Sequence, residues 1–287
     1  MSLRFCSFSS SSSGNCYYIQ SSGGTSILVD AGVPLRRLES NLESIGASPR
    51  DLAGIFLTHA HHDHVASYLI KKPFATRHGL DTYASTGTWR ELLRRGCGEL
   101  DHNACYRLEP SKTVEIGELA ITAYAKQHDA AGAVCFELTD GEERLAVVTD
   151  LGCYTDQLLA ALQGCHYYIF EANHDVQMEE RSPRPWSLKQ RVLGPQGHLS
   201  NEQAAEALTQ LAGQAKGIWL AHLSEECNCP DLACRVVSGT LQQAGLDVPV
   251  YNLPARTPSP FYGEDCRLEQ LTLFARAEVE NCSSATN

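Results

Sequence analysis

The stretch LTHAHHDHVA, Leu57–Ala66, places four histidines and one aspartate within six consecutive positions. It continues the apolar run GIFLTH, whose length and composition predict a short buried strand. If the chain leaves this strand extended, His59 and His61 point the same way, because alternate side chains share one side of an extended backbone. Asp63 and His64 then begin a turn and face another direction. Because imidazole and carboxylate groups favour zinc, manganese or iron over calcium, the spacing indicates two adjacent metal ions that share one loop.

Three further ligand candidates lie at or near the ends of other predicted strands, namely His128, Asp150 and His222. The runs LAVVTD, YYIFEANH and GIWLAH share this form, an apolar strand that finishes on a residue able to bind a metal. Ligands at strand ends converge in one crevice at the edge of a sheet. Asp150 is the candidate for a shared carboxylate, because an uncompensated charge beside an apolar strand would be costly. The alternative, a loop of solvated histidines, would not place further candidates at strand ends.

Two segments of the chain share one pattern, and this pattern decides the predicted architecture. CYYIQSSGGTSILVDAG and VCFELTDGEERLAVVTDLG each contain two strand patterns around a glycine-containing turn, and each ends in D-x-G. Two such hairpins predict an α/β fold in which two mixed sheets pack face to face, a four-layer αββα sandwich. We expect one domain over residues 1–258 and an extension of unknown role over 259–287. Outer helices are predicted at Arg36–Ile45, Thr88–Arg95, Thr155–Leu162, Asn201–Leu211 and Leu232–Ala244.

The composition restricts the classes of function. Of the 287 residues 43% are hydrophobic, which suits a substantial core, and no apolar run reaches the roughly 18 residues of a membrane span. The N-terminus has no signal-peptide pattern, so we expect a cytoplasmic protein whose 12 scattered cysteines are mostly free thiols. A structural zinc at Cys227 and Cys229 would need partners that the sequence does not identify. The net charge of −11 counts against nucleic-acid binding over a broad surface but allows a local basic patch.

Two segments bear on the substrate. GHLSNEQAAEAL contains His198 directly before a predicted helix that Ser200 caps, and free N–H groups at a helix start favour an anion. RSPRPWSLKQR contains basic charges and no acidic residue, so Arg184 and Lys189 are expected to hold phosphate groups, with Trp186 available for a base or sugar. The alternatives are that His198 merely packs near the cap and that the basic segment is a solvated loop.

Further polar residues are expected around these segments. The run SSSSSGN, residues 9–15, is expected to be a flexible loop that lines the substrate groove through Ser13 and Asn15. In FEANHD, Asn173 is expected at the substrate, and His174 is expected to support the metal ligands without binding a metal. Asp30, in the first D-x-G, is expected to have the same supporting role.

The pattern H-x-H-x-D-H after an apolar strand, preceded by LVDAG and followed by separate His, Asp and His positions, resembles the metallo-β-lactamase fold superfamily over residues 3–252. This resemblance implies two divalent metal ions, zinc or manganese, with iron as a third candidate. It assigns one metal to His59, His61 and His128, the other to Asp63, His64 and His222, and Asp150 to both. GHLS also resembles the G-H-S-T motif of ribonuclease Z, whose histidine assists phosphodiester cleavage.

Several short motifs together are similar to the YycJ/WalJ group of this superfamily: SSGN, THAHHDH, QHDA, TDLG, EANHD, PWSLKQR, GHLSNE and LAHLSEE. The chain departs from that group in its N-terminal loop, where serines replace a usual glycine. The resemblance implies a metal-dependent phosphodiesterase, a 5′-to-3′ exonuclease on double-stranded DNA that uses a metal-bound hydroxide, with Asp63, Asp150 and His198 as catalytic residues. The alternatives are a hydrolase of small phosphodiesters or thioesters and a non-catalytic regulatory module stabilised by metal. No membrane partner is expected, and the sequence leaves the oligomeric state open.

Overall fold

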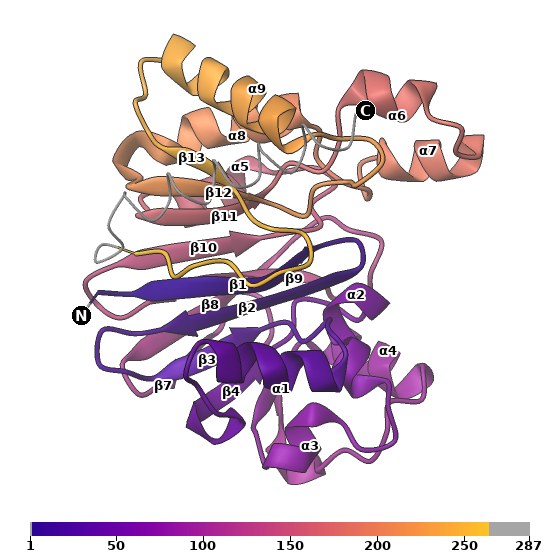
Figure 1. Cartoon of the computed structure of the whole chain (residues 1–287), viewed down its shortest axis with the longest axis vertical. Helices are drawn as coiled ribbons and strands as arrows, with labels where there is room; N and C mark the ends of the chain where they lie inside the picture. Colours follow the sequence, from indigo (N-terminus) through magenta and orange to yellow (C-terminus); the bar gives the residue numbers. More distant parts are fainter. Residues whose placement is uncertain (1, 264–287) are drawn as a thin grey trace.

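Two β-sheets pack face to face in the computed structural model, which describes residues 2–263, and helices cover the outer face of each sheet (Figure 1). The four-layer αββα sandwich expected from the two hairpins is therefore confirmed. Both hairpins form as antiparallel pairs, one in each sheet. In each, the D-x-G segment leads from the second strand of the hairpin toward an outer helix.

The first sheet, sheet A, contains the N-terminal strands in chain order. Its β1–β2 and β2–β3 pairs are antiparallel, and the pairs from β3 to β6 are parallel. The strands are β1 (Arg4–Ser11), β2 (Gly14–Gln20), β3 (Ser26–Val29), β4 (Leu52–Phe56), β5 (Thr82–Ala84) and β6 (Cys105–Arg107).

The second sheet, sheet B, has the spatial order β13-β12-β11-β10-β9-β8-β7. The pairs from β10 to β13 are parallel and those from β7 to β10 are antiparallel. The strands are β7 (Thr113–Ile116), β8 (Leu119–Ala125), β9 (Val134–Thr139), β10 (Arg144–Val148), β11 (Tyr167–Glu171), β12 (Gly217–Ala221) and β13 (Val250–Asn252).

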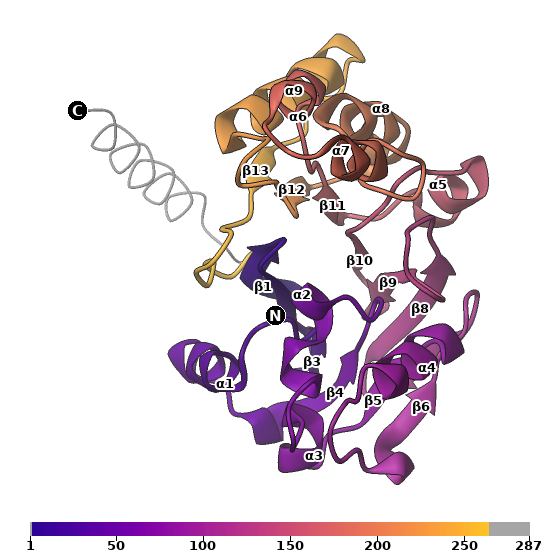
Figure 2. The same cartoon turned by 90° about the vertical axis from the view of Figure 1, so that its right-hand side faces the viewer.

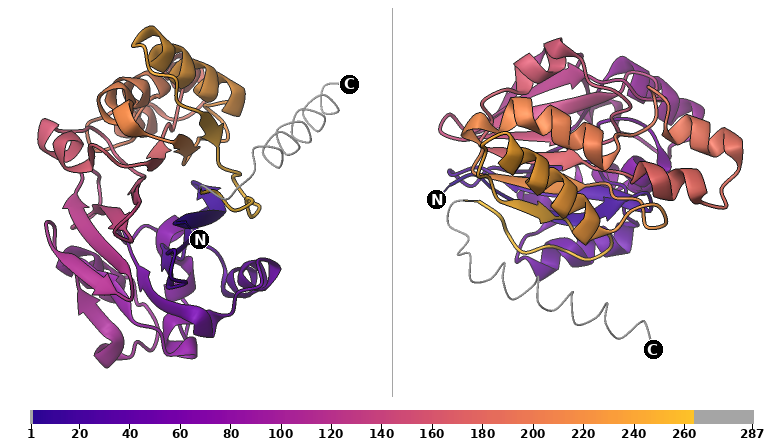
Figure 3. Two further views of the ribbon diagram at one scale, coloured as in Figure 1. Left: turned by 90° about the vertical axis from the view of Figure 1, so that its left-hand side faces the viewer. Right: turned by 90° about the horizontal axis from the view of Figure 1, so that it is seen from above.

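The predicted helices form within a few residues of their expected limits, and four short helices, α2, α3, α6 and α7, were not predicted. Sheet A is covered by α1 (Leu35–Ser44), α2 (His62–Val65), α3 (Phe74–His78) and α4 (Thr86–Arg94) (Figure 2). Sheet B is covered by α5 (Asp156–Leu162), α8 (Asn201–Leu211) and α9 (Pro230–Gln243). Two short helices, α6 (Val176–Arg181) and α7 (Trp186–Val192), project from one end of the molecule (Figure 3).

Alternation along the strands divides the apolar side chains between separate cores. On β10, Leu145 and Val147 point into the core between the sheets, whereas Ala146 and Val148 face the helices that cover sheet B. A third core lies between sheet A and its helices. Each fully buried side chain of the size of valine or leucine contributes about 1.5–3 kcal/mol to the stability of the fold.

The serine-rich run does not form the expected flexible loop. Ser9, Ser10 and Ser11 belong to β1 and are buried, so the loop prediction for these residues is wrong. Serine has a low intrinsic preference for strands, but here the backbone pairs with β2 and the hydroxyls have partners of their own. The Ser9 hydroxyl, for example, donates to the carbonyl oxygen of Ala255 at 2.7 Å.

The chain after β13 runs along the free edge of β1. Tyr262 exchanges two backbone hydrogen bonds with Phe5, and Ser259 donates its N–H to the Ser7 carbonyl oxygen while its hydroxyl accepts the Ser7 N–H. These bonds cover an edge that would otherwise be open to pairing with another chain. The first residues of the expected C-terminal extension thus lie on the sandwich, and residues 264–287 are outside the described part of the chain. The described cysteines are free thiols, as expected. No helix within residues 2–263 is long and apolar enough to cross a membrane.

Candidate metal centre

Three strands end in a strained backbone conformation at the candidate site. Asp30, Asp150 and His222 follow β3, β10 and β12 and have φ angles of 60°, 55° and 55°. Residues other than glycine rarely adopt this left-handed conformation, and it persists only where the surroundings enforce it. The strain turns each chain sharply away from its strand and places each side chain at the end of its sheet.

The segment LVDAG holds the histidine-rich loop in place. The Asp30 carboxylate accepts hydrogen bonds from the main-chain N–H of Thr58 at 2.8 Å and from the His64 ring at 2.6 Å. Gly32 lies so close to the loop that a Cβ atom there would be 1.6 Å from the Asp63 carbonyl oxygen. Asp30 therefore supports the loop as expected, and only glycine fits at position 32.

The first ligand cluster consists of three imidazoles that turn nitrogen atoms toward one another. His61 Nδ1 lies 3.1 Å from His59 Nε2 and 3.2 Å from His128 Nε2. The other nitrogen of His59 contacts the Thr58 hydroxyl at 3.0 Å, and that of His128 contacts the Gly197 carbonyl oxygen at 3.1 Å. Because a carbonyl oxygen only accepts, His128 donates through Nδ1 and its Nε2 presents a lone pair to the cluster. This is the donor set and the outer support typical of a transition-metal site.

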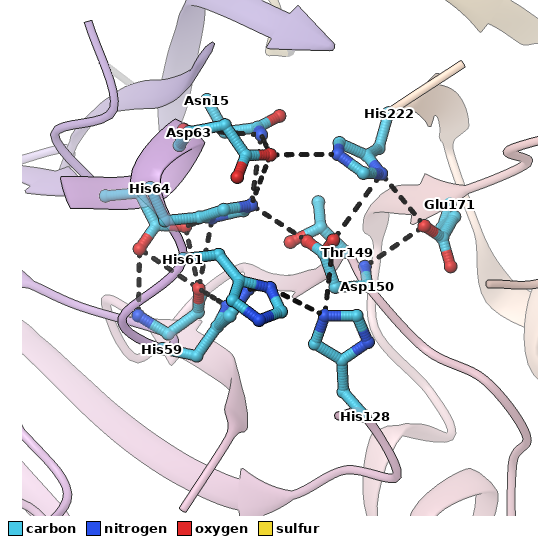
Figure 4. Close-up of polar contacts among 12 residues, drawn as sticks. Asn15, His59, His61, Asp63, His64, His128, Thr149, Asp150, Glu171 and His222 are labelled. Atoms are coloured by element: carbon cyan, nitrogen blue, oxygen red, sulfur yellow. Dashed lines mark hydrogen bonds and ion pairs between the residues drawn. The ribbon is translucent and has the colours of Figure 1, made fainter. Parts of the chain in front are cut away.

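The second cluster combines two carboxylates with two imidazoles, Asp63, His64, Asp150 and His222, whose ligand atoms lie within 4.8 Å of one another (Figure 4). His64 Nδ1 lies 2.6 Å from Asp30 Oδ2, and its Nε2 lies 3.0 Å from Asp150 Oδ2. Asp150 Oδ2 is buried and has no hydrogen-bond partner among the described residues. A buried carboxylate oxygen beside an imidazole nitrogen needs a positive charge, either from a proton on that ring or from a metal ion, so a divalent metal fits this cluster.

Asp150 connects the two clusters. Its Oδ1 lies 3.8 Å from His128 Nε2 in the first cluster, while its Oδ2 belongs to the second. Burial alone would raise the pKa of this carboxyl, but the neighbouring His222 and His64 hold it well below its usual range. Burial lowers the pKa of His59, whereas the carboxylates around His64 outweigh burial and raise its pKa. The first cluster is thus neutral and ready to bind, and the second carries the negative charge that offsets bound cations.

A buried glutamate that the sequence analysis did not single out organises this region. Glu171 Oε1 accepts from the Nδ1 atoms of His198 at 2.8 Å and His222 at 3.0 Å. Its two oxygens also accept main-chain N–H groups of residues 150, 151 and 199. Because its acceptor positions are already filled, Glu171 orients the two rings and is not itself a metal ligand. The available signal in the sequence was a charged residue at the end of the apolar run YYIF.

The two clusters open into a pocket of about 600 Å³ between the sandwich and the projecting helices. Its lining confirms that His198 faces the same space as the ligands, at 16% side-chain exposure. The residues that line it are Ser12, His61, His62, Asp63, Asp150, Asn173, Arg184, Leu188, Arg191, Val192, His198, His222, Ser224 and Glu226.

The basic segment contributes two arginines to the pocket. Arg184 is held by the buried Glu179 at 2.9 Å and by the exposed Glu226 at 2.8 Å. Arg191, the last residue of the basic segment, extends from α7 to Asp129 at 2.5 Å. Lys189 is instead buried, and its ammonium donates to the Glu180 carbonyl oxygen at 2.7 Å, so it joins α7 to α6.

The remaining predicted residues divide between the pocket and the packing behind it. Asn173 lines the pocket and also donates to the His222 carbonyl oxygen at 2.7 Å. Ser200 caps α8, where its hydroxyl accepts the Gln203 N–H, and it does not line the pocket. At this helix start the Gln203 N–H is therefore occupied, and the Asn201 N–H donates to the His174 carbonyl oxygen at 2.9 Å. His174 is buried behind the site, outside the two ligand clusters.

Two residues of the serine-rich run differ from expectation. Ser13 is not among the residues that line the pocket, and its hydroxyl lies 2.8 Å from that of Ser11, whereas its neighbour Ser12 lines the pocket. Asn15 is fully buried beneath the ligands, with Nδ2 3.2 Å from Asp63 Oδ2 and 3.0 Å from His64 Nε2 (Figure 4). Asn15 therefore contacts ligands, and the pocket wall does not include it.

Comparison with known proteins agrees with this geometry. Residues 25–222 match the family model described as the beta-lactamase superfamily domain. The chain belongs to this superfamily. It is 33% identical over 264 residues to exodeoxyribonuclease WalJ of Streptococcus pneumoniae serotype 2, which covers 90% of this chain and 97% of WalJ. It is 30% identical over 249 residues to exodeoxyribonuclease YycJ of Bacillus anthracis, which covers 86% of this chain and 92% of YycJ.

The fold is also that of solved members of the superfamily. The metallo-beta-lactamase fold protein YhfI from Bacillus subtilis superposes with a TM-score of 0.67 at 15% identity, covering 91% of this chain and all of that protein. At this level of identity the similarity supports the fold alone. The two His/Asp clusters make the site one that binds divalent metal, in agreement with the family.

Proposed function

We propose that this chain is a metal-dependent exodeoxyribonuclease that degrades double-stranded DNA from the 5′ end. One observation carries the proposal: two adjacent clusters of metal ligands and a histidine fixed by a buried carboxylate face one pocket. Two relatives with 30–33% identity over nearly their whole length bear the name exodeoxyribonuclease. A cytoplasmic location, expected from the sequence, belongs to the proposal because its substrate is DNA.

The ligand chemistry supports two divalent ions, zinc or manganese, with iron as a third candidate. When bound, such ions lower the pKa of water and neutralise charge on a phosphodiester. The first ion would be held by His59, His61 and His128, the second by Asp63, His64 and His222, with Asp150 shared between them. The residues outside these clusters orient the rings, so that the unprotonated nitrogens point inward.

His198 is the proposed proton donor to the departing oxygen. Its Nδ1 is committed to Glu171 at 2.8 Å, which leaves Nε2 as the ring nitrogen available to the pocket. The short contact with Glu171 fixes the direction of the ring. A histidine held in this way can transfer a proton from Nε2 to an oxygen in the pocket.

Arg184 and Arg191 are the proposed contacts to the DNA backbone. Both line the pocket. Ion pairs hold the two guanidinium groups in place, that of Arg184 with Glu179 and Glu226 and that of Arg191 with Asp129. Asn173 and Ser12 add neutral donors, and Trp186 is 66% exposed on the neighbouring surface of α7, where a base can stack. The two guanidinium groups together with bound metal ions would supply the local positive charge with which a chain of net charge −11 can hold a polyanion.

The test uses purified protein with manganese and three substrates: duplex DNA labelled at the 5′ end, bis(p-nitrophenyl) phosphate and a thioester. We expect labelled mononucleotide to be released from the duplex. Asp150→Ala should abolish release. His198→Ala, which removes the proposed proton donor, should lower the rate of release about 100-fold or more. His102→Ala, at an exposed histidine outside the site, is the matched control. Hydrolysis of only the small ester would refute the exonuclease proposal, and inactivity on all three would favour a binding module.

A further inference from the structure

The buried serines of β1 include one hydroxyl that contacts a metal ligand. Ser10 is 2% exposed, and its Oγ accepts the main-chain N–H of His222 at 3.0 Å. His222 has the strained φ of 55°, so this hydrogen bond fixes a backbone conformation that is unfavourable by itself. Ser10 lies in sheet A and His222 follows β12 of sheet B, so the contact joins the two halves of the sandwich at the site.

The contact continues through two more buried residues of the same hairpin. Ser10 Oγ lies 2.9 Å from Tyr17 Oη, and the Tyr17 hydroxyl donates to Asn15 Oδ1 at 3.5 Å. The Asn15 amide nitrogen lies 3.2 Å from Asp63 Oδ2. Because Tyr17 gives its only hydroxyl proton to the Asn15 oxygen, Ser10 must donate to Tyr17, and the series has a single direction, from the His222 N–H through Ser10 and Tyr17 to Asn15.

We propose that Ser10, Tyr17 and Asn15 are positioning residues that fix the separation of Asp63 and His222, and thereby the affinity of the second metal. The two ligands approach each other to 3.4 Å between His222 Nε2 and Asp63 Oδ2. They come from different sheets, and this series of buried hydrogen bonds spans the distance between them. The inference rests on the proposed dinuclear site, and it gives a reason for a serine at the buried position 10.

The series differs from the other supports of the site. Asp30 and Glu171 each orient imidazole rings on their own side, Asp30 at His64 and Glu171 at His222. Among the described residues, no hydrogen bond of Ser10, Tyr17 or Asn15 reaches the three-histidine cluster. Loss of the series should therefore affect the second metal and leave the first in place.

The test measures metal content directly. Ser10→Ala and Tyr17→Phe proteins are dialysed against a series of manganese concentrations, and bound metal is determined by elemental analysis and by the spectroscopic signature of a coupled manganese pair. We expect about a 10-fold or greater loss of affinity for the second metal with the first unchanged, and full occupancy again at high manganese. Ser7→Ala is the matched control, because Ser7 is fully buried in the same strand and its hydroxyl has no partner.

Further measurements separate positioning from a loss of folding. Tyr17→Phe keeps the aromatic ring in the core, so its fold should survive even if Ser10→Ala is unstable. The Ser10→Ala, Tyr17→Phe double variant should lose little more affinity than either single variant, because both interrupt one series. Equal loss of both metals, or a second-metal affinity equal to that of Ser7→Ala, would overturn the inference. Metal binding is measured without DNA, so the two proposals can fail separately. If the unmodified chain does not degrade DNA but the variants still lose the second metal selectively, the exonuclease proposal is refuted and this inference stands.

Discussion

Replacing Glu171 with glutamine tests whether one buried carboxylate organises the site. The substitution keeps the shape of the side chain but turns one acceptor oxygen into an N–H₂ donor. Oε1 accepts three groups, the two imidazoles of His198 and His222 and the Asp150 N–H, whereas Oε2 accepts the N–H groups of residues 151 and 199. Glutamine would therefore place its remaining oxygen at the Oε1 position, because this leaves fewer donors without an acceptor.

The substitution lowers stability because the main-chain N–H groups of residues 151 and 199 then face the glutamine N–H₂ group, which cannot accept a hydrogen bond. Each unsatisfied buried donor costs about 1–3 kcal/mol, so Glu171→Gln should lower the free energy of unfolding by about 2–6 kcal/mol. The loss of charge also weakens the bonds to His198 and His222, since hydrogen bonds to an ionised group are roughly twice as strong as neutral ones. His222 would then bind the second metal with a ring that is less well oriented.

Urea unfolding of the metal-free protein measures this cost. Glu137→Gln is the control, because Glu137 is also buried in sheet B but has a single ion pair, with Arg144 at 2.9 Å. We expect a change of about 1 kcal/mol or less for the control. If the two substitutions lower stability equally, Glu171 has no special role in the folded site and the argument fails.

Three further predictions concern the loop, the ligands and the substrate. Gly32→Ala should prevent normal folding or displace the loop, because its Cβ would overlap the Asp63 carbonyl oxygen, and thermal unfolding would show this as a large fall in Tm. In metal-free protein the carboxylates outweigh burial and raise the pKa of His222 to about 10, whereas burial lowers that of His128 to about 4. Binding of the second metal must therefore displace a proton. Calorimetry in buffers of different ionisation enthalpy should show that the affinity for the second metal rises with pH toward 10, while the affinity for the first metal changes little above about pH 6.5. Arg191→Ala should raise KM for DNA with little change in kcat, and equal KM values would exclude it as a backbone contact.

Much of the candidate site could be predicted because its pattern is local. The spacing of His59, His61, Asp63 and His64 lies within one turn, and the later ligands each follow an apolar strand. Strand ends are the places where a sheet presents side chains to a common crevice, so the structure brings all seven predicted ligands into two adjacent clusters. The layered fold could be predicted for a similar reason, since both hairpins have their turn and alternation in the sequence.

What could not be predicted depends on contacts between distant segments. Serines 9–11 have the composition of a loop. They form a strand because β2 pairs with them on one side and Ala255, 246 positions after Ser9, supplies a partner on the other. Lys189 and Arg191 differ by two positions in one basic run, yet one is buried and the other lines the pocket, because the orientation of α7 decides which side each faces. Glu171 had a visible signal, a charge after an apolar run, but its partners come from three other segments.

The placement of the ligands on both sheets also affects what a stability measurement would report. Asp63 and His64 follow a strand of sheet A, while Asp150 and His222 follow strands of sheet B, so bound cations would act as cross-links between the two sheets. Ligands that bind only the folded state add stability in proportion to the logarithm of their concentration, about 2.7 kcal/mol at 100 times Kd. The melting temperature is then a joint property of the chain and its metal supply, and it has a defined value only when the free metal concentration is fixed.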